Sequence, residues 1–446
     1  MKRRRLSLFR RARRGRAPRG GGIPRPARGL RAPVTAAVLL FLISAGTAPA
    51  LDFGATLENA TGFVKDPVPE FTQRNTLALW FSGDFGNLSL DAQGSYTFTL
   101  DRYYLFTVDV LDFGGEFLFE GGTPVALSFD AGRFVFSDFS GKLFDHRADG
   151  LRVGIGLPRL TITAEGAFTG LIQVPNSTVV LSISDRLDQT APGTVLAAPR
   201  LVESLTVEFP EILGRQTITL SALLQQDLRP AGNLAPGGGP VHTQYFGLGL
   251  EGPIVRPLYY NAFFYLNTGW TGTGNILAFL SGAELDAYFV EALASRIGAQ
   301  FVYASGDADY TSLYEGNTAG AGTGFLPVSA YTPMLVFTPR LSNLFFGRLL
   351  YSFRPFANSR SGAARNLQIE VSAAPFFRSV AGPISEGGVD AASTSLYLGT
   401  EADIVIRARP LSDLGLGLSF GIFFPGTAMT DPTIRMLGRL EVSVSI

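Results

Sequence analysis

The stretch that decides the fold is Ser393–Gly426, which reads STSLYLGTEADIVIRARPLSDLGLGLSFGIFFPG. In its first half, Glu401 and Asp403 alternate with apolar residues such as Ile404. Successive side chains of a β-strand point to opposite faces, so this arm has one charged and one apolar face. The segment 409–413 contains Pro and Asp and reads as a turn, and the second arm is again rich in Leu, Gly and Phe. The stretch therefore predicts a β-hairpin.

A hairpin of this kind fits a soluble sandwich or a membrane barrel, and the composition separates the two. The chain has 446 residues, of which 46% are hydrophobic and only 17% are charged. Soluble domains usually have about a quarter of charged residues. No uninterrupted apolar run after residue 50 approaches the roughly 20 residues that a membrane-spanning helix needs. With 52 Gly and 36 Phe, this balance favours an all-β envelope protein.

The N-terminus has the three parts of a secretory signal peptide. Residues 1–31 hold Lys2 and twelve Arg without an acidic residue, and a short apolar run covers 34–45. Ala48-Pro49-Ala50 then provides a cleavage site of small residues. We predict a signal peptide over residues 1–50, cleaved after Ala50, followed by a single domain over 51–446. A nucleic-acid-binding arm is the less favoured interpretation of the Arg run.

Removal of this leader changes the net charge from zero to strongly negative. All 37 acidic residues follow residue 50, whereas only 24 of the 37 Lys and Arg do, because 13 lie in the leader; the mature net charge is 24 − 37 = −13. Such a charge argues against binding of nucleic acid or another polyanion. Because the chain has no Cys, it has neither disulfides nor a thiolate metal site. No cofactor is implied.

After residue 50, segments of about ten residues alternate apolar and polar side chains, as in Leu88–Leu100. The connections alternate in length. Short ones are 157–159, 210–215, 252–257 and 409–413, and long ones are 173–200, 229–240, 306–327 and 378–392. Short turns at one end and long loops at the other are typical of an outer-membrane barrel. We predict a transmembrane antiparallel up-and-down β-barrel of about 18 strands, with 16 as the second choice.

The last predicted strand, Thr433–Ile446, runs to the end of the chain and would close the barrel. Barrels that the outer-membrane assembly machinery recognises usually end in Phe or Trp, and this chain ends in Ile. The segment Tyr103–Gly121 fits either one strand or two. Residues 171–200 are long enough to place a small constriction element inside the lumen.

Several short phrases resemble those of outer-membrane porin-like barrels of the alginate-export type. They are Gly132-Arg133-Phe134 with Asp149-Gly150, Ala304-Ser305-Gly306-Asp307, and Gly399-x-Glu401-x-Asp403 followed by Phe424-Pro425-Gly426. The resemblance implies a barrel that carries solutes through an outer membrane. Alginate exporters have a basic lumen for a polyanion, so a mature charge of −13 argues against alginate as the solute.

Two acid pairs are candidate selectivity residues: Glu284 with Asp286, and Glu401 with Asp403. Each pair has i, i+2 spacing and therefore lies on one face of a strand. The carboxylates either line the lumen, where they favour cations or hydrogen-bond a neutral sugar, or form salt bridges with wall arginines. Glycoside hydrolysis is disfavoured, because neighbours on one wall are poorly placed to flank a scissile bond.

Five arginines are the basic candidates for the lumen: Arg133, Arg152, Arg348, Arg354 and Arg407. The first four either form a basic ladder across the lumen from the acids or simply pair with nearby carboxylates, as Arg407 also would. The alternation around Arg133 is irregular, and a β-bulge there would reconcile it.

The remaining polar candidates carry weaker signals. His146 and His242 are the only histidines, and both fall in predicted loops. Two His alone do not make a typical zinc site, and proximity in sequence does not make a catalytic triad. Asp307, Asp309 and Glu315 lie on a long loop, which favours a solvated acidic loop over a calcium site.

Aromatic residues near the predicted strand ends are typical of interfacial girdles. They are Tyr103, Tyr104, Trp80, Trp270, Tyr259, Tyr260 and the Phe pairs 263/264, 345/346, 376/377 and 423/424. The competing interpretation is a stacking track for sugar rings. An outward orientation of the rings would favour the girdle.

The sequence as a whole predicts an outer-membrane channel, and not an enzyme, for passive diffusion of small hydrophilic solutes with a preference for cations. Its partners would be the lipid bilayer, the barrel assembly machinery and the solutes, without nucleic acid. A surface adhesin or receptor barrel that presents long loops is the alternative. A barrel enzyme is a third hypothesis, and it requires a Ser/His/acid cluster at one rim.

Overall fold

The computed structural model describes residues 50–446 except for 101–104, 192, 213, 231–233, 235–238, 273, 311–319 and 391. The predicted signal peptide, apart from Ala50, lies outside the described residues and remains a prediction. Glu315 and the aromatic pair at 103 and 104 also lie outside them.

The described chain forms one sheet of 18 strands, the first of the two predicted numbers. The strands are β1 (Ala50–Lys65), β2 (Pro69–Phe85), β3 (Leu88–Thr99), β4 (Leu105–Phe119), β5 (Val125–Ser137), β6 (Asp145–Leu157), β7 (Leu160–Phe168), β8 (Arg200–Ile212), β9 (Gln216–Asp227), β10 (His242–Val255), β11 (Leu258–Thr271), β12 (Gly274–Phe289), β13 (Ser295–Ala304), β14 (Leu344–Phe353), β15 (Gln368–Phe377), β16 (Tyr397–Ala408), β17 (Leu414–Pro425) and β18 (Arg435–Ser445). The short helices are η1 (Val174–Asn176), α2 (Ile183–Thr190) and α3 (Gly362–Arg365).

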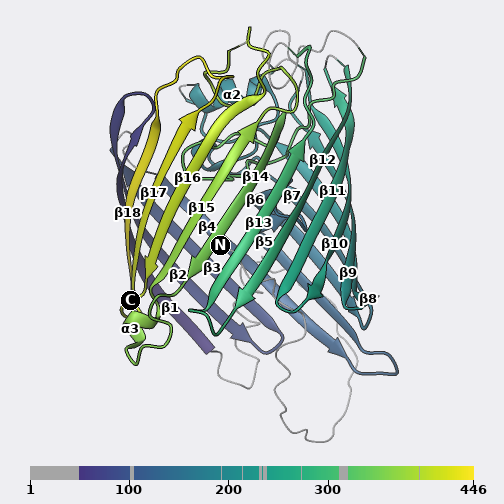
Figure 1. Cartoon of the computed structure of the whole chain (residues 1–446). Helices are drawn as coiled ribbons and strands as arrows, with labels where there is room; N and C mark the ends of the chain where they lie inside the picture. The colour runs from purple at the N-terminus through teal and green to yellow at the C-terminus, as the bar shows by residue number, and fades with distance from the viewer. Residues whose placement is uncertain are drawn as a thin grey trace, which may run out of the picture.

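Each strand pairs antiparallel with the next, and β1 pairs with β18, so the sheet closes on itself (Figure 1). The closing register joins Thr56 to Ser445 and Lys65 to Met436. Closure gives every strand two hydrogen-bonded neighbours and removes the exposed edges that an open sheet would present to lipid. The predicted barrel is therefore confirmed, and the segment that fits one strand or two is the single strand β4.

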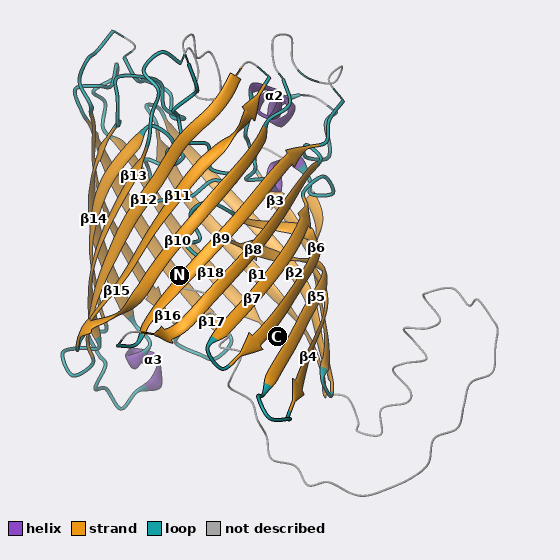
Figure 2. Cartoon of the chain, turned by 90° about the vertical axis from the view of Figure 1, so that its right-hand side faces the viewer, coloured by secondary structure: helices purple, strands orange, loops and turns teal. Residues whose placement is uncertain are grey.

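The two ends of the barrel differ as the connection lengths predict. At the end that carries the C-terminus, most strands are joined by short turns, whereas the opposite end carries the long loops and α2 (Figures 1 and 2). The exceptions are the 354–367 connection, which holds α3 at the short-turn end, and the tight turn 66–68 at the loop end. No helix among the described residues is long and apolar enough to cross a membrane.

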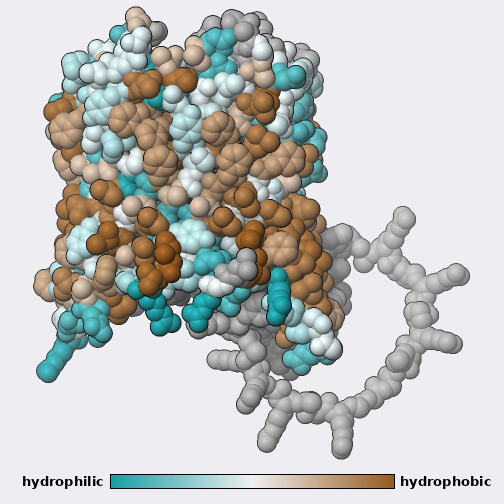
Figure 3. Space-filling view, turned by 45° about the vertical axis from the view of Figure 1, so that its right-hand side comes forward, coloured by the Kyte–Doolittle hydropathy of each residue, from teal (hydrophilic) through white to brown (hydrophobic). Residues whose placement is uncertain are grey.

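The outer wall is apolar, and the hairpin of β16 and β17 shows the alternation clearly. Ile404 and Leu418 are exposed on the outside, whereas Glu401 and Asp403 on the alternate positions are buried. Brown apolar residues cover much of the wall in Figure 3. An apolar exterior on a closed sheet is what lipid requires, because no water is available to hydrate polar groups there. The outer face agrees with the outer-membrane location predicted from the sequence.

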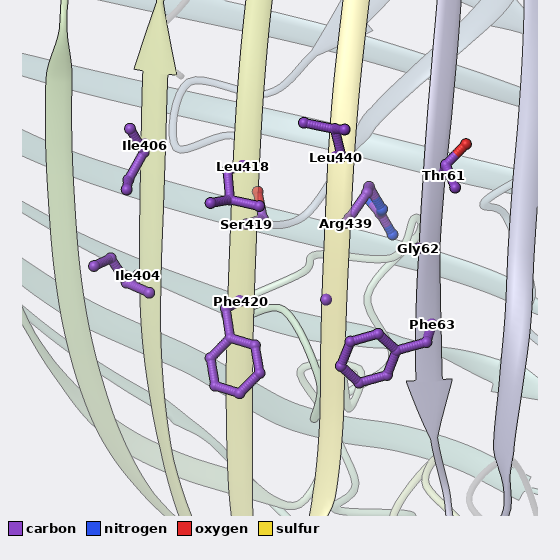
Figure 4. Close-up of a pocket in the computed structure, with 11 residues that line it drawn as sticks. Thr61, Gly62, Phe63, Ile404, Ile406, Leu418, Ser419, Phe420, Arg439 and Leu440 are labelled. Atoms are coloured by element: carbon purple, nitrogen blue, oxygen red, sulfur yellow. The ribbon is translucent and has the colours of Figure 1, made fainter.

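A shallow apolar groove crosses this outer wall where β16, β17, β18 and β1 meet (Figure 4). The rings of Phe63 and Phe420 lie on either side of β18 in this view. A Cβ on Gly438 would come within 2.5 Å of the Phe63 ring, so the close packing of that ring requires glycine.

The prediction of an aromatic girdle is confirmed for one residue of each Phe pair and wrong for the other. Phe264, Phe345, Phe377 and Phe424 lie on the outer face, but their neighbours Phe263, Phe346, Phe376 and Phe423 are at most 5% exposed and point inward. On the outside, rings contact one another from β11 to β16 in the order Phe264, Phe279, Tyr303, Phe345, Phe377 and Tyr397. This string of rings has the character of a girdle.

Two other aromatic predictions need correction. Trp80 shares the inner face of β2 with buried Ala78, and its ring lies over Gly54, whereas Leu79 between them is 59% exposed on the outside. Tyr259 lies on the inner face of β11 and contacts Tyr288 edge to face. Trp270 is 43% exposed on the outer face, as expected for a girdle residue.

The main hydrophobic core lies inside the barrel near its loop end. It forms where the described residues of three loops, 138–144, 169–199 (without 192) and 305–343 (without 311–319), pack against the inner wall. Leu143, Leu181 and Phe337, one from each loop, are fully buried. The fold therefore places these loops where any solute entering from the loop end must pass.

Candidate functional site

The 305–343 loop is attached to the inner wall by the acid pair of β16. One Glu401 oxygen accepts hydrogen bonds from the backbone N–H groups of Leu335 (2.8 Å) and Val336 (2.7 Å), and the other accepts from Phe337 (2.7 Å). Asp403 accepts a further bond from Leu335 (3.2 Å). The two carboxylates thus satisfy backbone donors of the loop, which is neither of the roles that the sequence suggested for them.

Packing reinforces this attachment. The ring of Phe337 stacks on Phe423 with centroids 4.4 Å apart and meets Phe376 edge to face at 5.1 Å. A Cβ on Gly421 of β17 would come within 2.8 Å of Val336, so this glycine lets the loop approach the wall. Aromatic pairs of these geometries are stabilising beyond their buried area. Phe376 and Phe423, two of the inner members of the split Phe pairs, therefore hold the loop.

The 138–144 loop crosses the lumen from the β5–β6 hairpin to β11 and β12, about five strands away along the sheet. Asp138 accepts a hydrogen bond from the Tyr265 hydroxyl (2.6 Å), and the Lys142 ammonium forms a salt bridge with Glu284 (2.6 Å). Lys142 also lies over the rings of Phe263 (5.4 Å) and Tyr331 (5.2 Å). The loop is therefore fixed at both sides of the barrel.

Lys142 keeps its charge in this buried position. Burial alone would lower the pKa of its ammonium, but the adjacent Tyr331 oxygen and the Glu284 carboxylate outweigh burial and raise that pKa above its usual value. The raised pKa favours the ammonium form of Lys142, so an ion pair ties the 138–144 loop to β12. Glu284 is one of the predicted lumen carboxylates, and its partner is this loop lysine rather than a wall arginine.

The 169–199 loop, which the sequence offered as a constriction element, does enter the lumen. Its Thr178 hydroxyl bonds Nδ1 of His146 (3.0 Å), and its Thr178 carbonyl accepts from the backbone N–H of Ala330 (3.1 Å). Arg340 donates to the carbonyls of Thr178 (3.0 Å) and Val180. The 305–343 loop also contacts the 138–144 loop, because the Ser329 N–H donates to the Leu143 carbonyl (3.1 Å). The three loops are therefore joined through the 305–343 loop and form one unit that narrows the lumen.

The lumen face of β3 to β7 has a different character. Asp91, Asp112, Asp130 and Glu165 line it, and their only basic partner on these strands is Arg152, which contacts Glu165 (2.5 Å) and Asp130 (3.7 Å). The charges of Asp91 and Asp130 both repel that of Asp112. The strand pairings Asp91↔Asp112 and Arg152↔Glu165 bring these groups together. This part of the wall therefore carries a surplus of negative charge.

Arg133 needs correction, because the structure places it on the outer face. Phe134 is buried on the inner face, where the Arg152 guanidinium lies 4.9 Å from its ring centroid. Arg133 instead forms a bidentate pair with Asp149 (both bonds 2.8 Å), on the same face as Leu151, which is 49% exposed. The register of β5 is continuous with both neighbours, so the predicted bulge is absent there. The Gly132-Arg133 and Asp149-Gly150 segments are thus paired with each other across β5 and β6.

The remaining arginines do not complete a ladder. Arg348 of β14 contacts Glu370 (3.5 Å) on a wall eight strands away from Arg152. Arg354 follows the end of β14 and is exposed, and Arg407 is exposed near the short-turn end of β16. Of the two interpretations that the sequence left open, pairing with nearby acids describes Arg152 and Arg348.

The second predicted acid of β12, Asp286, also has a partner that the sequence did not suggest. Its carboxylate forms a salt bridge with Arg296 of the adjacent strand β13 (2.6 Å). The four predicted lumen acids therefore all face inward, and each has a defined partner: a lysine, an arginine or loop backbone.

The weaker polar candidates are not brought together. The two histidines lie on strands and not in loops as predicted: His146 lies inside on β6, whereas His242 begins β10 and stacks on Trp270 at 6.0 Å. Asp307 accepts hydrogen bonds from the backbone N–H groups of Asp309 (3.1 Å) and Thr323 (2.8 Å), which closes its own loop. No group of three or more His, Asp or Glu side chains in the described part of the chain is arranged to hold a metal ion.

Sequence reasoning missed a buried ionic cluster beside α2. Arg200 of β8 contacts Asp185 (2.8 Å) and Asp227 (3.0 Å), and Arg229 contacts the same two acids (both 2.7 Å). The side chain of Arg200 is completely buried. Only the short Asp227-x-Arg229 spacing gives a local signal, because the other partners come from distant segments.

Comparison with known proteins supports the fold and leaves the family open. Neither a search for protein families nor a search of curated proteins found a match. Similar solved structures come from Pseudomonas aeruginosa. The outer membrane protein opdK is 13% identical with a TM-score of 0.58, and the match covers 89% of this chain and 98% of that one. OccK2 (OpdF) in complex with glucuronate is 13% identical with a TM-score of 0.55, over 89% and 98% of the two chains.

A third similar structure, OccK11 (OpdR) of the same organism, is 15% identical with a TM-score of 0.54, and the match covers 89% of this chain and 96% of that one. At these identities the likeness shows the fold alone. It confirms an outer-membrane porin-like barrel in general and does not support the alginate-export type in particular. The fold of this chain is that of an 18-stranded porin-like barrel.

Proposed function

We propose that this chain is an outer-membrane channel for small hydrophilic solutes with a preference for cations. The observation that carries the proposal is the acidic wall on β3 to β7, where Asp91, Asp112, Asp130 and Glu165 face the lumen with one basic partner, Arg152. Fixed carboxylates along a narrow water-filled path raise the local concentration of cations and lower that of anions.

The three inward loops support a narrow channel rather than a wide pore. They meet above the acidic wall and are held by hydrogen bonds, one cross-lumen salt bridge and ring stacking. A solute that passes them must be small, and the polar groups that it meets below are mainly acidic. Structures of the same fold include one solved with glucuronate and one with vanillate. We do not extend those ligands to this chain, since its acidic wall favours the opposite charge.

The test is the conductance of the refolded mature protein in planar bilayers, with reversal potentials in a salt gradient. We expect small channels that pass K⁺ more readily than Cl⁻. Replacing Asp91, Asp112 and Asp130 together by Asn should lower the ratio of cation to anion permeability several-fold. The matched control is Asp149→Asn, which changes an acid of the outer face. A channel that prefers anions would contradict the proposal.

A surface adhesin or receptor is the second candidate, and one observation favours it. The loop end of the lumen contains a packed hydrophobic core, with Leu181, Phe325 and Phe337 fully buried. A barrel that only displays loops would gain stability from such a core and would not conduct. Absence of single-channel steps from correctly folded protein would therefore favour this candidate over the channel.

A further inference from the structure

A group of buried hydrogen-bond donors lies at the junction of the inner wall and two loops. Arg200 of β8 is 0% exposed, Gln225 of β9 is 1% exposed, and Arg340 of the 305–343 loop is 8% exposed. Within the described part of the chain, four of their nitrogen atoms have no hydrogen-bond partner: Nε and Nη1 of Arg200, Nε2 of Gln225 and Nε of Arg340. Buried polar groups in folded proteins nearly always have partners, so these four require an explanation.

The donors belong to one place in the fold. Gln225 pairs across the sheet with Val202, two residues from Arg200. Thr243 of β10 donates to the Gln225 carbonyl oxygen (3.0 Å), which orients the amide. The charges of Arg200 and Arg340 both act on the Tyr245 hydroxyl, which is itself bound to the Leu326 carbonyl (2.5 Å). Arg340 donates to the Val180 carbonyl, and the N–H of the next residue, Leu181, donates to Asp185, the salt-bridge partner of Arg200. The two guanidinium groups therefore lie in the same buried region beside Tyr245, with the Gln225 amide on the neighbouring strand.

The charges at this junction do not balance without an additional anion. Arg200 and Arg229 are matched by Asp185 and Asp227, each within 3.0 Å of both guanidinium groups. Arg340, in contrast, forms no salt bridge with any described carboxylate, and its guanidinium donates only to two backbone carbonyls. An unpaired buried charge is costly, and a water molecule would satisfy the donors without neutralising the charge.

We propose that this junction binds one small anion of about the size of chloride. Every unpartnered atom is a donor and two of the three side chains are cationic. The burial of all three side chains favours a compact ion over a larger solute. The anion would connect Arg200 and Gln225 on the wall to Arg340 on the 305–343 loop. Through the contacts of Arg340 with Thr178 and Val180, it would also fasten the 169–199 loop. This role is independent of whether the barrel conducts.

The first test is unfolding of the refolded full-length mature protein in detergent, followed by tryptophan fluorescence, in potassium bromide, chloride or gluconate at equal ionic strength. Anything that binds only the folded state raises the unfolding temperature with its concentration. We expect a saturable increase with bromide and chloride and none with the larger gluconate. Equal unfolding temperatures in the three salts would overturn the proposal.

The second test places a carboxylate where the anion would be. Gln225→Glu should abolish the dependence on halide and should make the protein as stable in gluconate as the wild type is in saturating bromide. The matched control is Gln226→Glu, which changes the next residue on the opposite face of β9 and should retain the dependence. A Gln225→Glu protein that still responds to halide would contradict the assignment.

Direct observation needs no variant and so does not depend on how a variant folds. Crystals grown in bromide should show an anomalous peak within hydrogen-bonding distance of the Arg200 and Gln225 nitrogen atoms. An ordered water in that position, or bromide only at exposed sites, would refute the proposal.

Discussion

The two halves of the lumen use charge in opposite ways. At the loop end, several charges are bound to specific partners: Glu401 to loop backbone, Lys142 to Glu284, and Arg200 to Asp185. On the wall of β3 to β7, four acids face the lumen and one arginine pairs with two of them, while Asp91 and Asp130 repel Asp112. The polar groups of the first region hold the loops, whereas those of the second leave negative charge facing the lumen. Passage and selectivity are therefore expected to depend on different residues.

The largest expected effect comes from removing the ring that anchors the 305–343 loop. Phe337→Ala deletes a fully buried aromatic side chain, and truncations of this kind cost about 3–5 kcal/mol. Because the barrel wall is closed without the loop, we expect the loop to detach while the sheet persists. Limited proteolysis within 305–343 and a higher single-channel conductance would report this. Phe424→Ala, which truncates an outward ring of β17, is the control and should change neither.

A smaller effect is expected from the carboxylate that holds the same loop. Glu401→Gln retains the shape but replaces one carboxylate oxygen by an amide nitrogen, which cannot accept a hydrogen bond. At least one of the three backbone N–H groups therefore loses its acceptor, at a cost of about 2 kcal/mol. We expect more frequent opening of the loop, seen as flicker in single-channel recordings, without a change in selectivity. Glu441→Gln, on the lumen face of β18, should leave the flicker unchanged. A shift in ion selectivity with no flicker would instead assign Glu401 to the permeation path.

The third prediction concerns the acidic wall, and it changes the ratio of cation to anion permeability in the opposite direction to the Asp→Asn replacement. Arg152→Gln removes the only basic side chain that faces the lumen on β3 to β7, so the wall becomes more negative. The ratio of cation to anion permeability should rise, by roughly twofold given screening by salt. Arg133→Gln is the control, because its side chain lies on the outer face. An equal response of the two variants would mean that Arg152 does not face the ion path.

The architecture followed from local sequence patterns, whereas the loop unit did not. Alternation, turn chemistry and loop length are properties of neighbouring residues, and they were sufficient for a closed barrel of 18 strands. The same rule misplaced Arg133, because its pairing with Asp149 can be recognised only once the register is known. The partners of Glu401 are 64 to 66 residues away, and Lys142 is 142 residues from Glu284. The alternation of apolar and polar residues along a strand gives no information about contacts between residues so far apart in sequence.

The smallest predicted effect concerns the pH dependence of the Lys142–Glu284 salt bridge, for which we expect no change over a wide pH range. It tests whether charges at the loop end are paired, in contrast to those of the acidic wall. The Lys142 pKa is raised above its ordinary value of 10.5. A raised pKa means that the salt bridge contributes its full stability below the unfolded value and loses it as the pH rises through the folded value. Proteolysis of the 138–144 loop should thus be constant from about pH 6 to pH 10 and increase only above 10.5. Lys142→Met should show no such increase at high pH, because it has no ammonium to lose. An increase near neutral pH in the wild type would show that this lysine is not held as an ion pair, and the loop end would then share the unpaired charges of the acidic wall.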